Sequence, residues 1–209
     1  MERNSMSMCN GVHTAMTDLH IIWLGSDIPV RYQRNIESYT SDYNVIVWTK
    51  PINLINQDLF DRAKSYALKA DIMRLELLAK YGGVYTDIDS NLISPMPIES
   101  DLVCMTSESG YISNATIYAT KGHPAVIEAI RGIPENVNNL ERATIFDIAG
   151  ATYLTPIFQK YDHVKLPRSV VGKIGDRPSS IVHSNDASWA VGSKTEKRPI
   201  NCWINEHAS

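Results

Sequence analysis

The sequence predicts an α/β fold with a mostly parallel central sheet and helices on both of its faces. Short apolar runs alternate with helical patterns along most of the chain. Within residues 69–89 an amphipathic helix, a Gly82-Gly83 stop and an apolar strand follow one another. The 209 residues, 44% of them apolar, suffice for one sizeable core and are too few for two ordinary domains.

The first half of the chain is expected to hold three strands. Leu19–Leu24 is a short apolar strand, and a helix over Arg31–Tyr39 leads to the second strand, Asn44–Thr49. Residues Gln57–Tyr81 are helical, as one or two helices, and Val84–Ile88 is the strand that follows them. This order is typical of a Rossmann-like sheet, in which ligands bind beyond the carboxyl ends of the strands.

The second half continues the alternation. Leu102–Thr106 and Ala115–Ala119 are expected to be strands, and Pro124–Gly132 and Thr144–Tyr153 helices. The sequence contains no Gly-x-Gly-x-x-Gly loop and no Walker lysine. The charge of a bound phosphate would therefore have to be met by a metal ion.

Bulk properties exclude several classes of function. The net charge is −3 and basic residues are scattered, so no nucleic-acid or anionic-membrane surface is expected. The three cysteines have no paired spacing, which favours a reducing compartment. No apolar run has the length of a membrane span, and we expect a cytoplasmic protein. Residues 1–17 are expected to form a flexible leader, and 18–209 one domain.

Two carboxylates at the end of a predicted strand are the main sign of chemistry. Asp87 and Asp89 are two positions apart, so on an extended strand both side chains would leave the same face. They would repel each other unless a cation lies near them, and a hard divalent metal supplies one. An Asp-x-Asp pair is weak evidence by itself, but this one follows a strand of buried type.

The preceding helix carries charges within its apolar stripe. Asp71 and Arg74 share the apolar face, whereas Glu76 and Lys80 form an i,i+4 pair suited to solvent. Burying Asp71 and Arg74 is costly unless they pair with each other or with a polar ligand. From spacing alone, a structural ion pair and a ligand-binding pair are equally supported.

These residues also carry a resemblance to a known family. Residues 70–89 contain Ala-Asp-x-x-Arg and then Leu-x-x-Tyr-Gly-Gly-x-Tyr-x-Asp-x-Asp. This pattern resembles glycosyltransferases with a DxD-containing sugar-binding region, of the family thirty-two type, and more distantly the clostridial glucosylating toxins. The segments His20–Pro29 and Val45–Thr49 are similar to the first two strands of that family. The similarity runs from about Leu19 to Trp189.

The resemblance implies a single-domain GT-A fold and a metal-dependent transfer of a hexose. The donor would be a nucleotide-diphosphate sugar, with a UDP-sugar favoured and a GDP-sugar possible, and the cofactor Mn²⁺ or Mg²⁺. The acceptor would be a glycan or a glycoprotein, in a bacterium or a virus-infected host cell. The resemblance implies retention of the anomeric configuration, although the residues leave inversion by an aspartate base open.

The same comparison assigns roles to the residues around the metal. Asp89 would be a direct metal ligand, and Asp87 would contact the metal or the hydroxyls of ribose and sugar. Asp71 and Arg74 would hold hydroxyls of the donor sugar. His183 follows an apolar pair, as a ligand at a strand end would, and a metal role is favoured over an ordinary core or surface histidine.

Other residues would complete the pocket. Ser188 and Trp189 lie at a spacing like that of the family's Ser-Trp ending and would donate hydrogen bonds to the diphosphate, although Trp189 also suits core packing. Trp23 would line the base pocket or serve equally well as a core aromatic. Asn114 is a candidate for sugar binding or a simple turn residue, and Asp147 a candidate general base or acceptor contact.

Two further functions remain open at this point. The same carboxylates could serve a phosphoryl- or nucleotidyl-transferring enzyme, although a phosphate-binding loop is missing from the sequence. The chain could also be a catalytically silent module that binds a nucleotide sugar. The joint presence of the candidate donor-site residues argues against the silent module.

Overall fold

In this computed structural model the described residues are 16–107, 109–184 and 196–207. Nearly all of the predicted leader, 1–17, lies outside them, and so do Ser188 and Trp189. None of the helices in the described ranges is long and apolar enough to be a membrane span.

The central sheet has six strands in the order β2-β1-β3-β6-β5-β8. All neighbours are parallel except where β6 runs antiparallel to β3 and to β5, which confirms a mostly parallel sheet. In chain order the strands are β1 (Asp18–Ile22), β2 (Asn44–Trp48), β3 (Gly83–Thr86), β5 (Leu102–Thr106), β6 (Ile112–Ala119) and β8 (Val164–Leu166).

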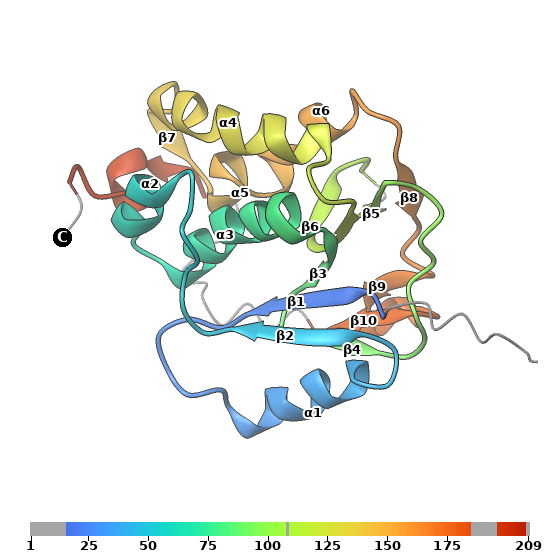
Figure 1. The fold of residues 1–209 in the computed structure, drawn as a ribbon. Helices are drawn as coiled ribbons and strands as arrows, with labels where there is room; N and C mark the ends of the chain where they lie inside the picture. Colours follow the sequence, from blue (N-terminus) through green and yellow to red (C-terminus); the bar gives the residue numbers. More distant parts are fainter. Residues whose placement is uncertain (1–15, 108, 185–195, 208–209) are drawn as a thin grey trace, which may run out of the picture.

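Helices cover both faces of this sheet, as expected. Figure 1 shows α1 on one side of β1 and β2, and α3 and α4 on the other. Alternate residues of β3 divide between two cores, because Val84 packs in the core that includes α1 and Tyr85 in the core on the α3 side. The helices are α1 (Val30–Tyr39), α2 (Gln57–Arg62), α3 (Tyr66–Tyr81), α4 (Pro124–Asn138), α5 (Ile145–Ile148) and α6 (Ala151–Phe158).

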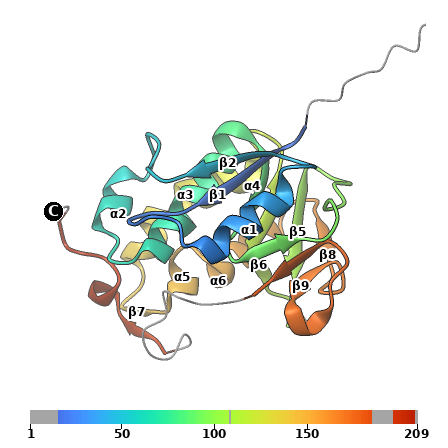
Figure 2. The ribbon, with the colours of Figure 1, turned by 90° about the horizontal axis from the view of Figure 1, so that it is seen from below.

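Smaller sheets that the sequence did not predict lie at the two ends of the molecule. One joins β4 (Ser90–Leu92), β10 (Ile181–His183) and β9 (Val171–Lys173). The other pairs β11 (Arg198–Pro199) with β7 (Arg142–Ala143). Seen from below, β8 and β9 lie at the opposite end from α2 and β7 (Figure 2). The first of these sheets matters for function, because β10 ends at His183 and β4 begins just after Asp89.

The glycine stop after α3 has a steric cause. Gly82 and Gly83 have φ angles of +73° and +94°, a backbone conformation that residues with a side chain rarely adopt. A Cβ on Gly83 would also lie 2.4 Å from the backbone oxygen of Asp18 on β1. The chain can therefore leave α3 and enter β3 beside β1 only with glycine at position 83.

Two predicted helical stretches are each broken. The Gln57–Tyr81 stretch divides into α2 and α3, and the side chain of Ser65 caps α3 by accepting a hydrogen bond from the backbone N–H of Leu68. The predicted helix Thr144–Tyr153 divides at Gly150, where a Cβ would lie 2.8 Å from the Cα of Phe146.

The expectation of a solvent-exposed Glu76–Lys80 pair is wrong. Glu76 is buried, and its carboxylate accepts hydrogen bonds from the backbone N–H groups of Ile55 (3.0 Å) and Asn56 (2.9 Å) just before α2. Lys80 instead lies over the ring of Tyr81. Helical spacing alone predicted a solvent face for α3. Every residue of α3 from 71 to 78 is buried, so α3 has no solvent face in this part.

This arrangement makes Glu76 a stabilising residue. We expect Glu76→Ala to lower the free energy of unfolding by about 2 to 4 kcal/mol, because two backbone N–H groups lose their acceptor. Glu76→Gln keeps one acceptor oxygen and should lose about half as much. Urea denaturation followed by circular dichroism measures both, and a loss below about 0.5 kcal/mol for the alanine variant would contradict this role.

Candidate active site

The two aspartates lie on a turn at the carboxyl end of β3 rather than on the strand itself. Strand β3 ends at Thr86, and the backbone N–H of Ser90 donates to the carbonyl of Asp87 at 3.0 Å. The strand alternation expected for Asp87 and Asp89 is therefore wrong in detail. The turn nevertheless places both carboxylates beside the same imidazole.

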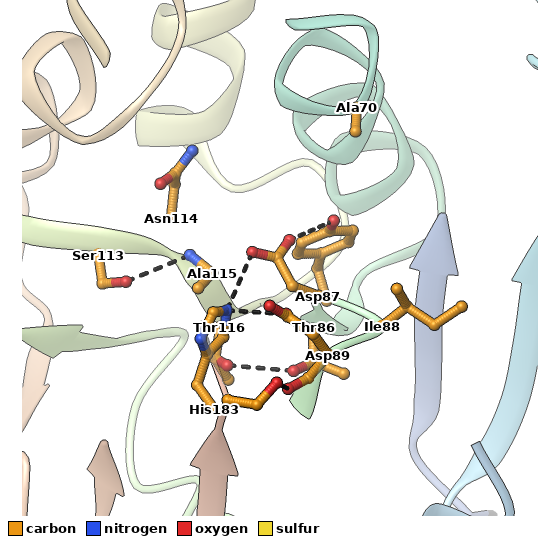
Figure 3. A network of polar contacts seen from close by, with 12 residues as sticks. Ala70, Thr86, Asp87, Ile88, Asp89, Ser113, Asn114, Ala115, Thr116 and His183 are labelled. Carbon is orange, nitrogen blue, oxygen red and sulfur yellow. Dashed lines mark hydrogen bonds and ion pairs between the residues drawn. The ribbon is translucent and has the colours of Figure 1, made fainter. Parts of the chain in front are cut away.

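His183 meets the two carboxylates from the end of β10. Its Nε2 lies 2.9 Å from Oδ1 of Asp89 and 3.5 Å from Oδ2 of Asp87. The pairing of His183 with Ser90 between β10 and β4 sets this approach. Figure 3 shows the three side chains converging, and their ligand atoms lie within 4.8 Å of one another.

The charges in this cluster depend on one another. Burial disfavours a charged imidazole, but the hydrogen bonds and charges of Asp87 and Asp89 outweigh it and raise the pKa of His183 to about 9. Burial also disfavours the charged form of Asp87, yet Arg74 and His183 hold the pKa of Asp87 below its usual value. The imidazolium thus supplies positive charge to the carboxylate pair.

The same three side chains fit a divalent cation. Two carboxylate oxygens and one imidazole nitrogen at this spacing are a donor set that proteins use for metals. Mn²⁺ accepts nitrogen and oxygen ligands alike, whereas Mg²⁺ prefers oxygen alone. A cation bound here would replace the proton on His183.

A second network places Arg74 at the centre of the site. Its guanidinium lies 2.7 Å from Oδ1 of Asp71 and 3.2 Å from Oδ1 of Asp87. It also donates to the backbone carbonyl of Asn114 and lies 4.4 Å above the ring of Tyr85. The buried guanidinium of Arg74 therefore connects α3, β3, β6 and the turn that carries Asp87 and Asp89.

Asp71 completes this network from the same helix. The side-chain amide of Asn114 donates to its Oδ1 at 2.8 Å. Burial raises the pKa of Asp71 to about 6, although Arg74 opposes the shift. The structural ion pair considered from the sequence is therefore present. Its two members also line a cavity, so a role in ligand binding is compatible with it.

This cavity has a volume of about 500 Å³, within the usual range of small-molecule sites. Most of the residues expected from the sequence line it: Trp23, Asp71, Arg74, Asp87, Asp89, Asn114 and His183. Trp23 is half-buried, with its indole N–H donating to the carbonyl of Ser26 at 2.9 Å. The remaining wall is largely apolar and includes Ile22, Leu24, Ala67, Ala70 and Phe146.

Tyr85 and Tyr66 are among the aromatic residues of this site that the sequence reasoning missed. The hydroxyl of Tyr85 donates to Oδ1 of Asp87 at 2.7 Å. Its position two residues before Asp87 on the predicted strand could have indicated this contact. Tyr66, at the start of α3, lines the cavity with its ring against Gly25, and no local pattern pointed to it.

Asp147 lies apart from the cavity lining. Its carboxylate accepts hydrogen bonds from the backbone N–H and the hydroxyl of Thr144, both at 2.8 Å. These contacts form a capping box that begins α5. The described contacts of Asp147 therefore stabilise a helix end, and its role as a general base or acceptor contact stays a prediction.

The sequence of the chain matches a known protein family. Residues 5–109 match the family described as glycosyltransferase sugar-binding region containing DXD motif. The chain belongs to this family. The matched region contains the Asp71–Arg74 pair and the DXD motif of Asp87 and Asp89.

The chain is similar in sequence to two yeast proteins, among others. It is 28% identical over 165 residues to inositol phosphoceramide mannosyltransferase 3 of Schizosaccharomyces pombe, covering 71% of this chain and 46% of the relative. It is 24% identical over 167 residues to mannosyl phosphorylinositol ceramide synthase SUR1 of Saccharomyces cerevisiae, covering 72% and 44%. The chain thus spans less than half the length of these relatives.

A solved structure confirms the fold. The PaToxG glycosyltransferase superposes with a TM-score of 0.54 at 19% identity, and the match covers 69% of each chain. The GT-A fold expected for this DXD glycosyltransferase family member is therefore present.

The central ion pair can be tested through stability. Arg74→Met should lower the free energy of unfolding by about 3 to 5 kcal/mol, because Asp71 and Asp87 lose their shared cation. Adding Asp71→Asn should recover part of this loss, since it removes the buried charge left unpaired.

Urea denaturation of the single and double variants measures both effects. Arg34→Met, an exposed position on α1, is the matched control. Strictly additive losses in the double variant would contradict the coupling of Asp71 and Arg74.

Proposed function

We propose that this chain is a metal-dependent glycosyltransferase that moves a hexose from a nucleotide-diphosphate sugar to a hydroxyl group of a glycan-type acceptor. The main support is the convergence of Asp87, Asp89 and His183, with ligand atoms within 4.8 Å, in the wall of a cavity that also contains Asp71 and Arg74. Membership of the DXD family agrees with this function.

The metal would be held by Asp87, Asp89 and His183. A bound Mn²⁺ or Mg²⁺ acts as a Lewis acid on the oxygens of the departing diphosphate. We favour Mn²⁺ because one of the three ligands is an imidazole. Tyr85 and Arg74 orient Asp87 through its Oδ1.

The donor sugar would be held by Asp71, Arg74 and Asn114. Both described contacts of the Asp71 carboxylate use Oδ1, so its Oδ2 stays available to accept a hydrogen bond from a sugar hydroxyl. Arg74 and the Asn114 amide hold this carboxylate in place. The apolar wall around Trp23 suits the flat face of a nucleotide base.

Mannose is the first candidate for the transferred hexose, because one yeast relative is named as a mannosyltransferase and the other as a mannosyl phosphorylinositol ceramide synthase. Their names also indicate an inositol phosphoceramide acceptor, so a phosphorylated polyol headgroup joins glycans and glycoproteins as an acceptor to test. UDP- and GDP-sugars are both retained as donors. Ser188 and Trp189 remain predicted contacts of the diphosphate.

Metal-dependent donor binding tests this proposal directly. With Mn²⁺ present, at least one of UDP-glucose, UDP-galactose and GDP-mannose should raise the melting temperature, and EDTA should abolish the shift. Asp89→Ala should weaken calorimetric binding of that sugar more than about 10-fold, because it removes a metal ligand. Asp162→Ala, an exposed carboxylate outside the cavity, is the control. Undiminished binding in the Asp89 variant would refute the metal assignment.

The reaction products separate glycosyl transfer from nucleotidyl transfer. Incubation with the binding donor and Mn²⁺ should release a nucleoside diphosphate, because the anomeric carbon–oxygen bond breaks. Chromatography of the nucleotide products measures this release. A nucleoside monophosphate as the main product would contradict glycosyl transfer, and full turnover in EDTA would contradict the metal.

A further inference from the structure

A second cavity borders the candidate metal site on the side of α1. Its volume is about 250 Å³, and Asp89 and Tyr32 line both cavities. The other lining residues come from α1, β4, β10 and their neighbours: Arg31, Asn35, Asn91, Ile174, Val182 and Ser184. The space is too small for a nucleotide sugar and suits one ring-sized group.

Two amide side chains present hydrogen-bond acceptors here. The NH₂ group of Asn35 donates to the carbonyl of Ile88 at 2.9 Å, and that of Asn91 to the carbonyl of Leu92 at 3.1 Å. These bonds leave the amide oxygens of Asn35 and Asn91 without a donor among the described residues. An amide oxygen accepts hydrogen bonds from hydroxyl groups, so the pair suits a polyol.

Arg31 adds a positive charge to the same cavity. Its guanidinium lies 4.7 Å from the ring centre of Tyr32 and donates to the Tyr32 hydroxyl at 3.1 Å. No carboxylate in the described part of the chain forms an ion pair with it. The aromatic contact positions an exposed guanidinium whose remaining N–H groups match the oxygens of a phosphate.

We infer that this second cavity is the acceptor subsite and that it takes a polyol phosphate. The amide oxygens of Asn35 and Asn91 accept from the polyol hydroxyls, and Arg31 binds the phosphate. This inference rests on the proposed glycosyl transfer, because the cavity adjoins the metal site through Asp89. Both free polyol phosphates and lipid headgroups carry this chemistry.

The position next to Asp89 gives the acceptor a role in the reaction. A polyol hydroxyl oxygen forms the new bond to the anomeric carbon of the donor sugar as the bond from that carbon to the diphosphate oxygen breaks. The electron pair of the broken bond stays on the diphosphate, and the hydroxyl proton passes to the diphosphate or to solvent. Sugar and acceptor then leave joined, together with a nucleoside diphosphate.

The test uses the full chain with Mn²⁺ and measures calorimetric binding of myo-inositol 1-phosphate and of uncharged myo-inositol. Arg31→Gln should weaken binding of the phosphate about 10-fold or more and leave myo-inositol unchanged, because only the phosphate uses the guanidinium. Asn91→Ala should weaken binding of both. Arg34→Gln makes the same charge change on an exposed part of α1 and should alter neither.

Donor binding separates this inference from the proposed function. The Kd of Arg31→Gln for the nucleotide sugar should stay within about twofold of the wild-type value. Arg31 does not line the larger cavity, which contains Asp71 and Arg74. If the wild type binds a nucleotide sugar but not myo-inositol 1-phosphate, the acceptor subsite is overturned and the proposed function stands. If no nucleotide sugar binds with Mn²⁺, the proposed function fails, and the subsite with it. An equal effect of Arg31→Gln on both inositol probes would also overturn the subsite.

Vesicles containing phosphatidylinositol distinguish the two sources of the ligand. Ile174 lines the cavity and is 66% exposed, so it can contact the apolar part of a lipid. Tighter binding to vesicles than to the soluble probe, lost in Ile174→Ser, would assign a lipid headgroup. Equal affinity for both would assign a soluble polyol phosphate.

Discussion

The buried guanidinium of Arg74 is the interaction on which the rest of the site depends. It pairs with Asp71 on its own helix and with Asp87 on the turn after β3, and it bonds to the backbone of Asn114 on β6. Burying so many charges is costly unless each is paired. The apolar packing of α3 against the sheet holds Arg74 beside these partners.

The balance of charge explains why this site suits a divalent cation. Three carboxylates, those of Asp71, Asp87 and Asp89, face the two cations Arg74 and protonated His183, so the cluster is short of positive charge. A divalent ion that displaced the imidazole proton would add two charges and remove one. The described cluster would then be neutral, which is the favoured condition for buried charges.

The two cavities meet at Asp89 and differ in character. The larger has an apolar wall with the Asp71–Arg74 network at one side, whereas the smaller offers amide oxygens and one exposed guanidinium. A turn between β3 and β4 is well suited to stand between them, because its backbone is held by both sheets. Asp147 caps α5 through its described contacts, and its role as a general base or acceptor contact stays a prediction.

The donor-side roles of Asp71, Arg74, Asp87 and Asp89 came from the resemblance to a known family and stay predictions. The sequence by itself determined the α/β alternation and the glycine stop after α3. These features depend on periodicity and turn residues within a short stretch of chain, so the sequence of that stretch is enough to predict them. The tertiary structure alone decided the burial of Glu76 and the cavity at Arg31, and it brought His183 to Asp87, 96 positions away in the chain. Such contacts depend on how strands and helices pack, and β10 reaches Ser90 only through a small sheet that no local pattern encodes.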